Sequence, residues 1–144
     1  MIRRLAALFI LLPLAACIRT KGSGEIEDPS AFLFAPDHVV QVSISMSTAD
    51  WDALRVQGLS LGDIFGGPCL AGPFPNPFTY YPATVTVDGE TLTNVAVRKK
   101  GFLGSLDTTK PSLKIKFDEF VPGREFHGLE RLTLNNCKQD KSYL

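Results

Sequence analysis

The residues best suited to bind a ligand are cations in the second half of the chain. Between residues 92 and 116 the sequence holds six Lys or Arg residues and one acid, Asp107. If these segments form paired strands, side-chain alternation places four of the cations on one sheet face: Arg98, Lys100, Lys114 and Lys116. Such a face either grips phosphate or is simply a solvated surface that protects a strand edge.

A short glycine-containing segment joins the two expected strands. Gly101 and Gly104 lack side chains, so backbone amides in this segment can approach an anion closely. The Gly-x-x-Gly spacing is common, and it fits a phosphate-covering loop as well as an ordinary hairpin.

Catalytic machinery of the usual kinds is not evident. The two histidines, His38 and His127, stand beside no Ser or Cys in a nucleophile motif, and we expect them at the surface or in turns. The 144 residues include 15 basic and 15 acidic side chains. A formal charge of zero argues against a general nucleic-acid binder.

Period-two alternation predicts the strands that must position the cations. Apolar residues alternate with polar ones from Val39 to Met46, and again from residue 112 to 117 and at Leu132 and Leu134. Asp88-Gly89 between two β-rich runs, 83–87 and 91–99, predicts a hairpin with a type I′ turn.

One short helix and one long irregular segment complete the pattern. Ser47 can cap a helix that ends before Gly58. Residues 58–77 are rich in Gly, Pro and Phe, and we favour an insertion over a functional loop there. These elements predict an α+β domain with a mainly antiparallel sheet of about five strands and one short helix.

The N-terminus is typical of an export signal. Arg3 and Arg4 precede an apolar run of ten residues, too short to span a membrane. The following Leu14-Ala15-Ala16-Cys17 resembles the lipobox of bacterial lipoproteins, in which the Cys is acylated. That resemblance implies a lipid anchor at Cys17, and outer-membrane sorting if the host is Gram-negative. An ordinary secretory peptide is the alternative.

The expected organisation is a signal peptide over 1–17, a flexible tether over 18–36 and a domain over 37–144. The tether is expected because residues 18–36 are mostly polar and include Gly22-Ser23-Gly24. Cys69 and Cys137 either form a disulfide, which an envelope compartment permits, or stay as separate thiols.

Several motifs, in order, resemble the N-terminal part of the CotH kinase family. They lie in the segments 34–40, 47–54, 81–89, 94–101, 110–117 and 128–136. The first reads Phe-Ala-Pro-Asp-His-Val-Val, and the fifth reads Lys-Pro-Ser-Leu-Lys-Ile-Lys-Phe. The resemblance covers about residues 33–144, nearly the whole expected domain.

The resemblance implies an atypical protein-kinase-like fold in a family of spore-coat and envelope proteins, some of which transfer phosphate from ATP. By that analogy Arg98, Lys100, Lys114 and Lys116 become phosphate-contact candidates. Residues 101–105, including Gly101 and Gly104, become the loop that covers the phosphates. ATP with Mg²⁺ is the cofactor expected for a full-length relative.

The sequence departs from the family near residue 144. Cys137 occupies a position that is normally rich in Asn, and Lys141 stands where the family usually has Pro. The family's metal-binding and catalytic acids would follow, so we expect a truncated member with at most weak nucleotide binding and no phosphotransfer alone. A missing C-terminal lobe or a protein partner would then complete it. The alternative is a non-catalytic adhesion or structural module.

Overall fold

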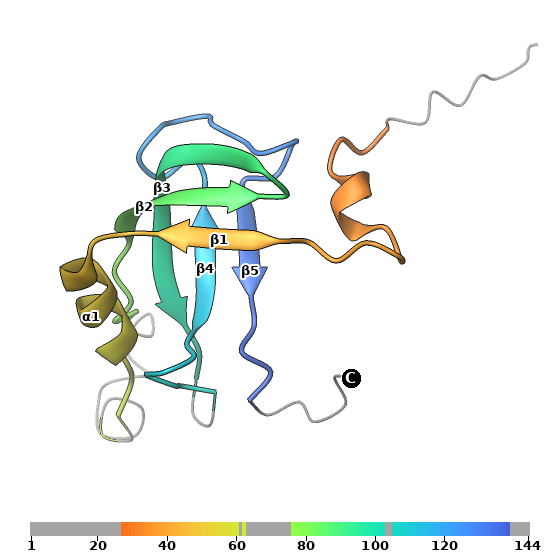
Figure 1. Ribbon diagram of the computed structural model, residues 1–144. Helices are drawn as coiled ribbons and strands as arrows, with labels where there is room; N and C mark the ends of the chain where they lie inside the picture. The colour runs from red at the N-terminus through yellow and green to blue at the C-terminus, as the bar shows by residue number, and fades with distance from the viewer. Residues whose placement is uncertain (1–26, 61, 63–75, 103–104, 139–144) are drawn as a thin grey trace, which may run out of the picture.

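The computed structural model describes residues 27–60, 62, 76–102 and 105–138, which form an antiparallel sheet with one helix (Figure 1). Each strand pairs with the next one along the chain, in the order β1-β2-β3-β4-β5. The elements are η1 (Ala31–Phe34), β1 (Val42–Ser45), α1 (Thr48–Val56), β2 (Tyr81–Val87), β3 (Glu90–Lys100), β4 (Ser112–Lys116) and β5 (Arg131–Leu134). The α+β prediction with a mainly antiparallel sheet is confirmed.

The sheet is curled, so that β1 lies across β4 and β5 in Figure 1. An irregularity in the β2–β3 pairing helps to bend it. Ala83 pairs with Val95 but Val85 pairs with Leu92, so one extra residue of β3 is accommodated between them. Asn94 has a φ of 53° there. This is a β-bulge, which increases local twist and bends the strand.

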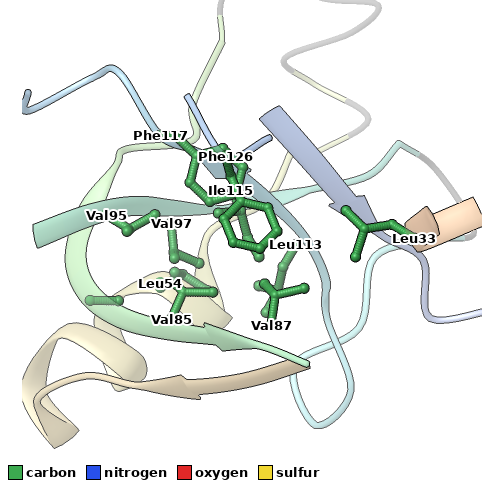
Figure 2. Close-up of a cluster of buried hydrophobic side chains, with 11 residues drawn as sticks. Leu33, Leu54, Val85, Val87, Val95, Val97, Leu113, Ile115, Phe117 and Phe126 are labelled. Carbon is green, nitrogen blue, oxygen red and sulfur yellow. The ribbon is translucent and has the colours of Figure 1, made fainter. Parts of the chain in front are cut away.

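The hydrophobic core fills the inside of this curl (Figure 2). Alternate residues of the three central strands point inward and are fully buried, including Val85, Val97 and Ile115. Leu54 of α1 and Phe117, after β4, are also fully buried. The predicted alternation is therefore confirmed, and it leaves the opposite sheet face free to carry polar side chains.

The predicted turn and cap are both present. Ser47 Oγ accepts a hydrogen bond from the backbone N–H of Asp50 at 3.0 Å, which satisfies a free donor in the first turn of α1. Asp88 and Gly89 have φ values of 47° and 89°, as a type I′ turn requires at both central residues.

The N-terminal strap, residues 28–41, packs against the sheet although residues up to 36 were expected to be a tether. Leu33 is only 2% exposed and belongs to the core. Asp88 holds the far end of the strap, since its carboxylate accepts the backbone N–H of Gln41 at 2.8 Å and lies 2.8 Å from His38 Nε2. The packed part of the chain thus begins before residue 37, because the buried side chain of Leu33 anchors a segment that the sequence assigns to the tether.

Other predictions fall outside the described residues. The signal peptide with Cys17, most of the 58–77 segment with Cys69, and Gly104 all belong to this group. Cys137 is half-buried and forms no disulfide with another described residue; a bridge to Cys69 stays a prediction. Within the part of the chain that the structure describes, no helix is long and apolar enough to cross a membrane.

Candidate functional site

The strand register brings the predicted cations onto one surface. Arg98 of β3 lies directly opposite Lys114 of β4, and Lys100 lies opposite Ser112. Lys116 lies opposite Ala96, in the next residue pair whose side chains point to the same face as Arg98 and Lys114. We call this surface the outer face, because the alternate residues Val97 and Ile115 point into the core.

One end of the outer face is neutralised by acids. Lys116 Nζ lies 2.7 Å from Glu119 and 3.7 Å from Asp118. The hydrogen bond to Glu119 is the main cause that raises the pKa of Lys116 above its usual value. Arg131, which pairs with Lys116 across β4 and β5, is itself paired with Glu130. These two cations therefore add little net positive charge to the outer face.

Arg98 is held by aromatic rings. Its guanidinium carbon lies 5.4 Å from the ring centroid of Tyr80 and 5.8 Å from that of Phe78, both within cation–π range. Its Nη1 donates to the carbonyl of Lys99 at 3.2 Å, while Nε is buried without a hydrogen-bond partner within the described residues. The rings fix the guanidinium at the centre of the outer face.

An open pocket of about 310 Å³ adjoins this guanidinium. Three predicted site residues line it, namely Arg98, Lys100 and Gly101. The side chains of Phe78 and Phe102 contribute apolar walls. Lys100 Nζ donates to Asn135 Oδ1 at 3.1 Å, which ties this cation to the segment after β5. The pocket combines two cations with two aromatic rings, a lining suited to a flat anionic ligand.

Lys114 differs from its neighbours. It lies between Arg98 of β3 and Thr133 of β5, at the middle of the outer face. Within the described residues it has no hydrogen bond or ion pair to a side chain. Its ammonium is therefore available to a ligand without first breaking an internal contact.

The described ends of the loop after β3 are hydrogen-bonded to each other. Ser105 Oγ accepts from the backbone N–H of Phe102 at 2.9 Å, and the backbone N–H of Ser105 donates to the Phe102 carbonyl at 3.0 Å. Gly101 has a φ of 145°, and a Cβ there would lie 3.1 Å from both Leu106 and Ser105. Glycine is thus required at 101 for the turn, whether or not a phosphate lies beneath it.

Buried Asn136 organises the end of this loop. Its side-chain amide donates to the carbonyls of Ser105 and Lys110, each at 3.0 Å, and its backbone N–H donates to Ser112 Oγ at 2.9 Å. Asp107 closes the loop through the backbone N–H of Lys110 and the Lys138 ammonium. These contacts, led by the Lys110 N–H, lower the pKa of Asp107 to about 2.

Lys99, unlike its neighbours Arg98 and Lys100, lies on the core face of the sheet. It points to the core face and is 2% exposed, and its Nζ donates to the carbonyl of Arg55 in the last turn of α1 at 2.6 Å. Burial lowers the pKa of Lys99. The sequence places Lys99 on the face of Val95 and Val97, so alternation alone predicts its inward direction.

The aromatic part of the site could not be predicted from the sequence. Phe78 and Tyr80 follow the proline-rich segment for which the sequence favours an insertion, and nothing in their spacing predicts contact with Arg98. Asn136 was part of an Asn-rich motif, but its bonds to the 105–110 loop depend on the β4–β5 pairing.

One further hollow lies on the opposite side of the sheet from the outer face. Val42, Ile44, Met46, Trp51 and Leu113 line most of an apolar hollow of about 500 Å³ on the core side. Among the described residues, no three His, Cys, Asp or Glu side chains gather in a group that could hold a metal ion.

Comparisons with known proteins found no match: no family model, no curated protein and no solved structure is significantly similar to this chain.

Proposed function

We propose that this chain is the nucleotide-gripping module of an envelope lipoprotein that resembles the CotH kinase family, and that its outer face binds phosphate. The observation that carries the proposal is the convergence of Arg98, Lys100 and Gly101 on one pocket, with Lys114 directly opposite Arg98. Arg98 and Lys114 would contact the phosphate oxygens, Arg98 as a fixed planar donor and Lys114 as a mobile point charge.

The pocket's aromatic walls favour a nucleotide over a bare phosphate. Phe78 and Phe102 provide apolar surface on which a base can stack beside the cations. Magnesium fits less well, because the described residues offer it no cluster of carboxylates. The proposal therefore concerns binding by cations and includes no phosphotransfer step.

A second candidate function has an observation in its favour. Three of the four predicted cations already have partners inside the protein: Arg98 with two rings, Lys100 with Asn135, and Lys116 with Glu119. A sheet face that satisfies its own charges suits a non-catalytic adhesion or structural module. Only Lys114 distinguishes the two functions, because its charge has no such partner in the described part of the chain.

Thermal unfolding of the full chain with added ligand tests the proposal. ATP and inorganic triphosphate should raise the Tm by about 4 °C at a tenfold excess over the Kd, because a ligand that binds only the folded state stabilises it. Adenosine at the same concentration as ATP should produce a much smaller shift, because it lacks the phosphates that the cations contact. Absence of any shift with ATP or triphosphate would support the structural module.

Three lysine variants locate the effect. Lys114→Ala should remove most of the triphosphate shift, whereas Lys116→Ala should remove less because Glu119 already pairs with that ammonium. Lys110→Ala is the matched control, since Lys110 is an exposed cation outside the sheet. An equal loss in all three variants would indicate non-specific charge attraction and not a site.

A further inference from the structure

The N-terminal strap exposes large apolar side chains on both sides of its buried anchor. Phe32 is 49% exposed, Phe34 60% and Val39 76%, while Leu33 between the two rings is 2% exposed. These exposed side chains lie within eight positions of the sequence. A single exposed hydrophobic residue would need no explanation. A group of exposed apolar side chains, in contrast, marks a contact surface.

Contacts on two turns hold this apolar surface in place. The ring of Phe32 meets the ring of His127 edge-on, with centroids 5.0 Å apart. Pro29 lies so close to Gly128 that a Cβ on that glycine would lie 2.9 Å from it. With the Asp88 contacts at the other end, these interactions hold the strap on both sides of Phe34. The exposed side chains therefore belong to a formed surface.

The chain length between strap and anchor limits their separation. Glu27, the first described residue, is ten positions after Cys17. A chain of that length reaches at most about 35 Å. If Cys17 carries the lipid, the strap stays near the bilayer, and even a weak apolar contact becomes effectively intramolecular.

The charge of the strap selects the kind of membrane contact. Residues 28–41 contain no Lys or Arg, and they include the acids Asp28 and Asp37. Attraction to anionic headgroups is thus not the driving force. A zwitterionic phospholipid surface fits better, because its interface accepts apolar side chains without requiring cations.

We propose that the N-terminal strap docks on a zwitterionic bilayer through Phe34, Phe32 and Val39. This inference rests on the lipid anchor of the proposed function. β3 begins beside the strap at Glu90, whose carboxylate lies 2.8 Å from His127, and ends at the pocket with Lys100. Docking by the strap would therefore leave the phosphate pocket at the far end of this strand, facing the aqueous compartment.

Tryptophan reporters in the full chain test the docking. Trp51 is the only tryptophan, so Trp51→Phe provides a silent background. Phe34→Trp places a reporter on the strap, and Val56→Trp is the control at α1, which Figure 1 shows on the other side of the sheet from η1. The two positions are matched in exposure, at 60% and 62%. Val39→Trp is a second strap reporter if Phe34→Trp does not fold.

The measurement is fluorescence quenching in phosphatidylcholine vesicles with brominated acyl chains, together with the intact mass of the protein. The strap reporter should lose at least half its emission and the Val56→Trp control less than about a tenth. Acylated protein with an unquenched strap reporter, or with equal quenching at both positions, would overturn the docking while the anchor stands. A mass without acyl chains would remove the anchor, and the docking proposal would fail with it.

Discussion

The two faces of the β3–β4 pair differ in burial, although their residues alternate along the same two strands. On the inner face, Val97 and Ile115 are fully buried and lie opposite each other. On the outer face, Arg98 and Lys114 also lie opposite each other but remain partly accessible. One step along either strand separates a residue that stabilises the fold from one that is available to a ligand. At these two residue pairs, strand alternation alone separates the buried positions from the accessible ones.

The largest effect is expected from two substitutions at neighbouring positions of β4, one on each face. Ile115→Ala should lower the free energy of unfolding by about 2–4 kcal/mol, because it removes buried methyl groups and leaves a cavity. Lys114→Ala should change it by less than about 0.5 kcal/mol. Urea denaturation of both full-chain variants measures the difference. Similar losses in the two variants would break the division between the faces.

The β-bulge decides which residues of β3 point inward, and Arg124 holds it. The Arg124 guanidinium donates to the carbonyls of Thr93 and Asn94 at 2.8 and 2.6 Å, and to that of Phe117 at 2.9 Å. Arg124→Ala should cost about 1–3 kcal/mol in urea denaturation, because these carbonyls lose a charged donor. Arg131→Ala is the control, since Arg131 bonds to exposed Glu130. An equal cost for both would mean that the bulge needs no clamp.

Lys99 is the exception to the comparison, because it is a cation on the buried inner face. The pH dependence of stability tests the cost of its burial. Because burial lowers the pKa of Lys99 in the folded state, the unfolded chain binds the proton more tightly. Stability should therefore rise as the pH increases from the lowered pKa toward 10.5, the ordinary value for Lys. Lys99→Met should flatten that rise and change stability at pH 7 by about 1 kcal/mol or less, since it removes a buried cation but leaves the Arg55 carbonyl unpaired. Denaturation at a series of pH values measures this, with Lys110→Met as the exposed control; identical slopes in Lys99→Met and the parent would contradict it.

The smallest expected effect concerns Asp107, in the segment 105–110 between β3 and β4. The pKa of Asp107 is lowered to about 2 in the folded protein, below its ordinary 3.8. Its stabilisation is thus present above pH 3.8 and is lost as the pH falls through about 2. Asp107→Asn should reduce the acid sensitivity of the Tm in this window, and Asp52→Asn on the exposed side of α1 should not. An unchanged acid profile in Asp107→Asn would show that the loop does not depend on this carboxylate.

The sequence predicts the faces and turns well because they depend on local patterns. Alternation places Arg98 and Lys114 correctly once the strands pair, and Asp88-Gly89 identifies its own turn. The role of Leu33 could not be predicted in this way, because its burial depends on two distant turns that receive the strap. The stacking of Tyr80 on Arg98 likewise depends on the β2–β3 register and on the bulge within it.

A titration of the ¹⁵N-labelled full chain with ATP, followed by backbone amide chemical shifts, tests whether the outer face binds phosphate. The account predicts the largest changes at residues 76–78, 98–102 and 112–116, and only small changes in β1. Changes centred on the apolar hollow beside Trp51, or no changes at millimolar ATP, would contradict the claim that the outer face binds phosphate.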